Sequence, residues 1–178
     1  MIPRPILAAG VAALALLAAD AALAQVSYVR AGRLVDPVAG KVLGDRLIRI
    51  EGQRITAVSA WAGTPTDGPV RDWSGLTVLP GLIDMHTHIV DQEQTENIAE
   101  PLLTGAAEQA YVGAAHARST LMAGFTSVRD VGTWRAFGDV ALRDAIDQGL
   151  VPGPRMSVAG AYVTTPGGGG EVTGIAFD

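Results

Sequence analysis

Residues 79–88 read LPGLIDMHTH, and this stretch decides how the rest of the 178-residue sequence is interpreted. The apolar run after the Pro-Gly pair predicts a strand over residues 82–89. Because alternate side chains of a strand share a face, Asp84, His86 and His88 point the same way. Two adjacent imidazoles can offer nitrogen atoms to one divalent cation. A bare His-x-His also arises by chance as a metal-free pair, so its surroundings have to support the metal interpretation.

The sequence after this strand alternates between helical and extended patterns. Apolar side chains at three- and four-residue spacing predict helices over residues 102–123 and 134–148. Apolar runs predict further strands over 125–131 and 155–163. The order strand, helix, strand, helix, strand indicates parallel strands with right-handed crossovers. We therefore expect an α/β layer or part of a (β/α) barrel, with the histidine pair at the carboxyl, catalytic end of its strand.

The sequence before residue 80 has a different character. Extended runs at 26–30, 33–35, 46–50, 54–58 and 76–79 predict short strands, and no helix of useful length fits there. Gly32 divides the first two runs, and residues 51–53 predict the turn of a hairpin. We expect an all-β segment ahead of the α/β part.

The first 24 residues are typical of a secretory signal peptide. Arg4 gives a short positive start, an Ala/Leu-rich core follows, and Ala22-Leu23-Ala24 forms a small-x-small cleavage signal. An uncleaved membrane anchor is the alternative, but the core is short for a spanning helix and Asp20 interrupts it. The expected location is periplasmic or extracellular, with membrane contact only through this transient segment.

The composition excludes several classes of protein. There are 13 Lys and Arg against 18 Asp and Glu, a formal net charge of −5, and no basic run, which argues against a nucleic-acid partner. The absence of cysteine excludes disulfides, thiolate metal sites and a cysteine nucleophile. Hydrophobic residues make up 48% of the chain, enough to build a core.

The sequence resembles the amidohydrolase superfamily of metal-dependent hydrolases. There, a first barrel strand with the pattern Pro-Gly-(Leu/Phe)-Ile-Asp-x-His-x-His comes after a small β-sandwich segment, and residues 80–88 match it. Residues 123–132, AGFTSVRDVG, resemble the second strand of the imidazolonepropionase-like and Xaa-Pro dipeptidase-like branch. Residues 146–162 resemble the third-strand region of the same branch. The likeness covers residues 26–178.

The resemblance implies a composite fold, a β-sandwich joined to a (β/α)8 TIM barrel. The expected domains are a signal peptide at 1–24, a β-sandwich segment at 25–80 and an incomplete βαβαβ portion of the barrel at 81–178. It also implies one or two divalent metal ions, most often Zn²⁺, with His86 and His88 as ligands. The implied reaction is hydrolysis of an amide, cyclic amide or dipeptide carbon–nitrogen bond by a metal-activated water. The expected partner is a small substrate of that kind, and a full-length form could assemble as a homo-oligomer.

The family's remaining ligands come from later barrel strands: a carboxylated lysine or a glutamate, two histidines and the catalytic aspartate. This sequence ends before them, and its one lysine, Lys41, lies in the β segment. We therefore expect an N-terminal fragment that is inactive alone. A non-catalytic metal-binding or interaction module, and one half of a split enzyme, remain as alternatives.

Several other polar residues are candidates for supporting roles. Asp84 is suited to supporting the histidine pair from one step deeper on its strand. Arg129 and Asp130 end the second predicted strand, where a substrate or supporting role and a structural ion pair are both open. His116 is predicted to be a solvated residue away from the buried helix face, and the acidic residues Asp91, Glu93 and Glu96 are predicted to form a solvated loop.

Overall fold

The computed structural model describes residues 25–91, 103–166 and 168, in two compact units divided between Pro80 and Gly81. The predicted signal peptide at 1–24 lies outside these residues, as do Glu93 and Glu96. Within the described part of the chain, no helix has the length and hydropathy that a membrane crossing requires.

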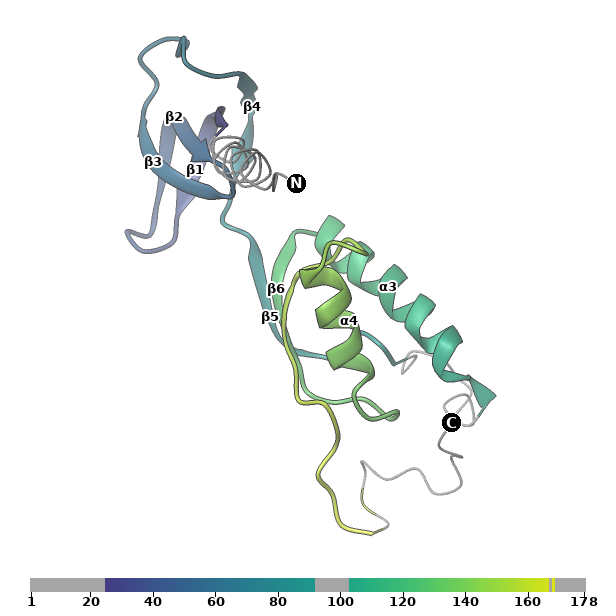
Figure 1. Cartoon of the computed structure of the whole chain (residues 1–178). Helices are drawn as coiled ribbons and strands as arrows, with labels where there is room; N and C mark the ends of the chain where they lie inside the picture. The colour runs from purple at the N-terminus through teal and green to yellow at the C-terminus, as the bar shows by residue number, and fades with distance from the viewer. Residues whose placement is uncertain (1–24, 92–102, 167, 169–178) are drawn as a thin grey trace, which may run out of the picture. The chain divides into compact units, whose positions relative to one another are not determined.

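The first unit contains one four-stranded sheet, in agreement with the all-β character expected there (Figure 1). Its strands are β1 (Val26–Asp36), β2 (Lys41–Glu51), β3 (Arg54–Ala60) and β4 (Val70–Val78), in the order β3-β2-β1-β4. β2 pairs antiparallel with both β1 and β3, and β4 pairs parallel with β1. The predicted turn between β2 and β3 is present, with Gly52 at a positive φ of 56°.

Gly32 does not divide β1, contrary to the sequence pattern. The strand continues through it, and the register against β4 shifts between Ala31 and Arg33. A Cβ atom on Gly32 would collide with the backbone carbonyl of Ser74 on β4. The glycine therefore permits a close approach of two strands at an irregular pairing, rather than ending one of them.

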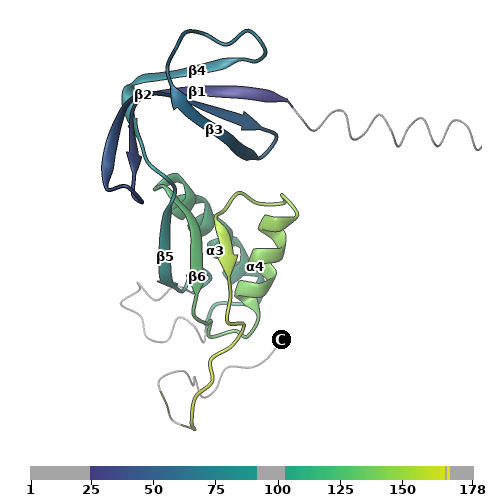
Figure 2. The ribbon, with the colours of Figure 1, turned by 90° about the vertical axis from the view of Figure 1, so that its left-hand side faces the viewer.

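The second unit is a three-stranded parallel sheet with two crossover helices, as the alternating pattern predicts. Its elements are β5 (Leu82–Thr87), α3 (Ala106–Met122), β6 (Phe125–Asp130), α4 (Gly138–Asp147) and β7 (Arg155–Ser157). The strand order is β5-β6-β7, and Figures 1 and 2 show both helices on the same face of the sheet. This is the arrangement expected for the first part of a (β/α) barrel.

The helix α3 buries only part of the apolar stripe that the sequence spacing predicts, which runs through Ala106, Ala110 and Ala117. The buried residues are Gln109, Gly113 and Ala117, whereas Ala106 and Ala110 are exposed. Gly113 lets α3 approach the segment after β5, because a Cβ atom at Gly113 would lie 2.9 Å from a methyl carbon of Val90. Ala117 then packs in a core with Ile89, Val90, Val128 and Leu142.

Two details of the parallel sheet differ from expectation. The strand β7 ends at Ser157, before the predicted end at residue 163, and the chain leaves the sheet through Gly160 at a φ of 85°. Ile83 and Met85 alternate with the Asp84, His86 and His88 face and are apolar, so burial under the helices would be expected, but they are 64% and 59% exposed. The reason is that β5 is an edge strand, and the two helices contact β6 and β7 instead.

Candidate functional site

A pocket of about 430 Å³ lies at the carboxyl end of β5. Seven of the eight residues that line it are polar, and they come from the end of β5, the segment after it and α3: His86, Thr87, His88, Ile89, Asp91, His116, Ser119 and Thr120. All three histidines of the chain therefore line one pocket. This is the catalytic end of the strand in a (β/α) barrel, where the sequence pattern placed the histidine pair.

The imidazole rings of His86 and His88 lie beside each other. Their centroids are 5.4 Å apart and their planes are inclined by 65°. An ion at about 2.0–2.1 Å from one nitrogen of each ring lies about 3 Å from each centroid, so two rings in a tetrahedral shell are about 5 Å apart. The spacing of the two rings fits a shared divalent cation of this kind.

The described residues supply only part of a metal shell. No group of three or more His, Cys, Asp or Glu side chains within residues 25–91, 103–166 and 168 is arranged to hold an ion. Two imidazoles are fewer than the three or four protein ligands of zinc sites. Imidazole nitrogens are suitable zinc ligands, but the described residues supply fewer of them than a zinc site needs.

Hydrogen bonds orient the ring of His88. Its Nδ1 atom lies 2.8 Å from the backbone carbonyl oxygen of Gly132 and 2.8 Å from the hydroxyl oxygen of Tyr162. The ring of Tyr162 in turn packs edge-on against Trp134, with centroids 5.2 Å apart. Both partners of His88 come from segments that lie after other strands, so the tertiary fold fixes the ring of the second histidine.

Asp84 supports the backbone beside the histidine pair. It is half-buried, and its carboxylate accepts a hydrogen bond of 3.1 Å from the backbone N–H of His86. This contact holds the peptide that carries one candidate ligand, while the ring of that ligand stays exposed. The Asp84 carboxylate therefore holds the backbone of the strand that carries the two imidazoles.

Asp130 is a buried carboxylate that joins the ends of β5 and β6. It is 1% exposed and accepts hydrogen bonds from the backbone N–H groups of Ile89, at 2.7 Å, and Gly132, at 3.2 Å. Burial raises the pKa of Asp130, an effect that those two hydrogen bonds oppose. The carboxylate thereby connects the segment after His88 to the residue whose carbonyl contacts the His88 ring.

Arg129 lies next to Asp130 in sequence but on the other face of β6. Its side chain is exposed, and the described residues include no ion pair between the two. Its backbone carbonyl accepts a hydrogen bond of 3.3 Å from the hydroxyl of Thr87. Of the two adjacent candidates, Asp130 lies in the network around the histidine pair, and Arg129 contributes its main chain.

The sequence pattern placed His116 correctly as an exposed residue but placed Asp91 wrongly. His116 is exposed, but its Nδ1 lies 2.9 Å from the carbonyl oxygen of Ile89, and it lines the same pocket as the histidine pair. Asp91, predicted to be solvated, is buried and accepts hydrogen bonds from the Gln109 side chain and the Trp134 backbone. The error at Asp91 arises because Gln109, a buried residue of α3, donates a hydrogen bond to its carboxylate.

Tyr162 and Gly132 were not singled out from the sequence. The available signal was positional, because Tyr162 falls at the end of the third predicted strand and parallel strands end at one edge of a sheet. Nothing in a single sequence indicates that its hydroxyl contacts His88. That contact depends on the chain leaving β7 early.

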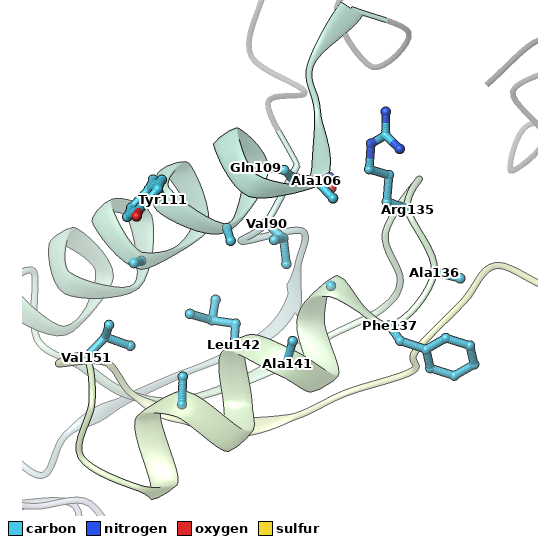
Figure 3. Close-up of a pocket in the computed structure, with 14 residues that line it drawn as sticks. Val90, Ala106, Gln109, Tyr111, Arg135, Ala136, Phe137, Ala141, Leu142 and Val151 are labelled. Atoms are coloured by element: carbon cyan, nitrogen blue, oxygen red, sulfur yellow. The ribbon is translucent and has the colours of Figure 1, made fainter. Parts of the chain in front are cut away.

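A second pocket, of about 510 Å³, lies between α3 and α4 (Figure 3). Apolar side chains such as Val90, Leu142 and Val151 make up most of its lining, and the charged exception is Arg135. The Arg135 guanidinium donates hydrogen bonds to the carbonyl of Thr104. This groove contains none of the three histidines and no carboxylate, so the histidine pocket is the better candidate for chemistry.

Several known proteins resemble this chain in sequence or in fold. A model of the amidohydrolase family matches residues 77–174. The dihydroorotase of Anaeromyxobacter dehalogenans strain 2CP-C is 29% identical over 155 residues, which cover 84% of this chain and 31% of that protein. The dihydroorotase of Pelotomaculum thermopropionicum is 37% identical over 100 residues, which cover 56% of this chain and 20% of that protein.

The structural neighbours include two hydrolytic enzymes. A Xaa-Pro dipeptidase with methionine in its active site has a TM-score of 0.74 and 31% identity, covering 85% of this chain and 37% of that one. The ochratoxinase of A. niger has a TM-score of 0.69 and 25% identity, covering 84% and 34%. The chain thus spans about a third or less of the length of these relatives.

The family model covers more than half of the sequence, including β5, both helices and the two later strands. This match is consistent with the fold, with the position of the histidine pair and with the structural neighbours. This chain belongs to the amidohydrolase family.

Proposed function

We propose that this chain provides the first two metal ligands, His86 and His88, of a metal-dependent hydrolase that acts on carbon–nitrogen bonds. The observation that carries the proposal is the pair of imidazoles 5.4 Å apart at the carboxyl end of β5. Membership of the amidohydrolase family supports the reaction class.

The residues of the pocket have separate tasks in this proposal. His86 and His88 hold a divalent ion, most suitably Zn²⁺, which supplies a Lewis acid and an activated water when bound. Asp84 holds the His86 backbone, and Asp130 holds the main chain on both sides of the His88 ring. These contacts keep the two rings in place before an ion arrives, which lowers the cost of ordering them on binding.

The names of the relatives suggest the substrate class. They include dihydroorotases among sequence relatives, and a Xaa-Pro dipeptidase and a prolidase among structural neighbours. We propose an amide, cyclic amide or dipeptide as the substrate. An assay of the complete enzyme on acyl-proline dipeptides and on cyclic amides separates these classes.

Zinc binding to the 178-residue chain tests the role of the pair. We expect His86→Ala and His88→Ala each to lower zinc affinity at least about tenfold, measured by isothermal titration calorimetry, because each removes one ligand. His116→Ala is the matched control, since His116 lines the same pocket but is held by the Ile89 carbonyl. Equal affinity in wild type and both ligand variants would contradict the assignment.

We further propose that the 178-residue chain alone does not turn substrate over. The described residues supply two imidazoles, fewer than the ligands of a catalytic zinc site. The purified chain with added zinc should release no product from amide, dipeptide or lactone substrates. Zinc-dependent turnover that His86→Ala abolishes would overturn this expectation and would establish the chain as an enzyme by itself.

We also propose that the chain is exported and that residues 1–24 are removed. The support is the sequence pattern of a positive start, an apolar core and a small-x-small cleavage signal. Mass spectrometry of the protein recovered from the periplasm of an expressing bacterium should give an N-terminus at Gln25. An intact N-terminus in the membrane fraction would favour an anchor.

A further inference from the structure

The hydrogen bonds around His88 determine more than the orientation of its ring. Two oxygen atoms, from the Gly132 carbonyl and the Tyr162 hydroxyl, each lie 2.8 Å from Nδ1. A carbonyl oxygen can only accept a hydrogen bond. An unprotonated Nδ1 would bring two lone pairs together at that distance, so the geometry requires a proton on Nδ1.

The hydroxyl of Tyr162 then also accepts from that proton. Nδ1–H is shared between two acceptors in a three-centre hydrogen bond. A neutral imidazole carries one proton, so this arrangement leaves the lone pair on Nε2. In free histidine the proton prefers Nε2, which means that the surrounding protein has to impose the opposite tautomer.

The approach of Tyr162 depends on a glycine. Gly132 has a φ of 132°, and a Cβ atom built there would lie 2.5 Å from the Tyr162 ring. Trp134 also packs edge-on against that ring, with centroids 5.2 Å apart. Backbone conformation and aromatic packing therefore bring the hydroxyl of Tyr162 to His88, although 74 positions separate the two residues.

We propose that Tyr162 is a positioning residue for His88: with the Gly132 carbonyl, it holds the proton on Nδ1 and so makes Nε2 the nitrogen that faces a metal ion. The part concerning the metal rests on the proposed function, whereas the tautomer does not. Histidine ligands in metal sites commonly have their second ring nitrogen held in this way, which fixes the ring and increases its basicity.

Nitrogen NMR of the 178-residue chain without metal tests the tautomer. The sequence has only three histidines, so His86→Ala and His116→Ala assign each ring. At alkaline pH, long-range proton–nitrogen spectra should show His88 as the Nδ1–H form. In Tyr162→Phe we expect the His88 signals to move toward an exchange average of both tautomers. A His88 that is predominantly Nε2–H in wild type overturns the proposal.

Zinc affinity tests the consequence for binding. Tyr162→Phe keeps the ring that packs on Trp134 and removes only the hydroxyl, so we expect about a tenfold loss of zinc affinity with little change in melting temperature. Tyr111→Phe is the control, because that tyrosine is 80% exposed on α3 and lies away from the histidine pair. If wild type binds zinc, equal zinc affinity in Tyr162→Phe overturns the positioning role.

The two measurements separate this inference from the proposed function. If wild type binds no zinc but His88 is the Nδ1–H form and Tyr162→Phe disturbs it, the proposed metal role fails and the positioning role stands. If wild type binds zinc through both histidines but Tyr162→Phe changes neither tautomer nor affinity, the metal role stands and the positioning role fails.

Discussion

The two units of this chain build sheets in different ways, and only one of them carries the candidate site. In residues 25–80, β2 pairs antiparallel with its neighbours in sequence, so most contacts are local. In residues 81–166, each parallel pairing needs a crossover through α3 or α4. Parallel strands bring the ends of β5 and β6 together at one edge, which is where the histidine pair lies.

The contacts within the first unit serve its stability, whereas those within the second unit also shape the candidate site. The first unit has a small core of Val29, Ala31 and Ile48, and polar contacts such as Arg30–Asp45 and Arg33–Thr77 join its strands. In the second unit, buried polar groups such as Asp91 and Asp130 join loops around the pocket. We therefore expect variants in the first unit to change its stability and leave zinc affinity unchanged.

The largest effect is expected at Gly32 in the first unit. Gly32→Ala places a methyl group against the Ser74 carbonyl, and a backbone atom cannot move aside as a side chain can. We expect a loss of about 3 kcal/mol or more in the unfolding free energy of this unit, with zinc affinity unchanged. Amide hydrogen exchange of β1 and β4 measures it. Gly44→Ala is the control, because nothing lies within 4 Å of a Cβ there; equal protection in both variants contradicts the role of Gly32.

A smaller effect is expected from Leu142 in the core of the second unit. Leu142→Ala removes a side chain that is 6% exposed and packs with Val90 and Val128, so we expect a loss of about 2–3 kcal/mol in the stability of this unit. Denaturant unfolding followed by Trp134 fluorescence in a chain lacking the other tryptophans measures it. Leu150→Ala, at a 71% exposed residue, should change stability by less than about 0.5 kcal/mol.

Asp130 should make the stability of the second unit depend on pH. Its raised pKa means that the folded state binds its proton more tightly than the unfolded state does. This contribution to stability is present at acid pH and is lost as the pH rises from the ordinary carboxyl range through the raised value. Asp130→Asn should remove that pH dependence from the second unit.

The same variant should lower stability at neutral pH by about 1–2 kcal/mol, because one of the two N–H groups of Ile89 and Gly132 then faces an amide NH₂. Unfolding curves across the acid range, compared with Arg129→Gln, measure both effects. An unchanged pH profile in Asp130→Asn contradicts the assignment.

The smallest effect is expected at Tyr28. Its hydroxyl donates to the Asp67 carboxylate at 2.9 Å and accepts from the Arg49 guanidinium at 3.2 Å. Tyr28→Phe should cost about 1 kcal/mol in the first unit and leave zinc affinity unaltered. Thermal unfolding beside zinc titration measures the two quantities, and a change in zinc affinity would show that the units are energetically coupled.

The sequence predicted the elements of this chain well, because their signals are local. The α/β order after residue 81 reflects spacings of two, three and four residues, which arise directly from strand and helix geometry. The pair His86 and His88 lies where the pattern of one strand predicts it. Element ends were less accurate, as β7 shows, because the end of a strand depends on its partner.

Only the tertiary structure decided which polar groups meet. Tyr162 reaches His88, Asp130 holds Ile89, and Asp91 accepts from Gln109, across 74, 41 and 18 positions respectively. A local pattern cannot predict such hydrogen bonds, because each needs a donor and an acceptor from different segments to coincide within about 3 Å. The sequence by itself offered His86 and His88 as candidate ligands, and only the fold brought the Gly132 carbonyl and the Tyr162 hydroxyl to Nδ1 of His88.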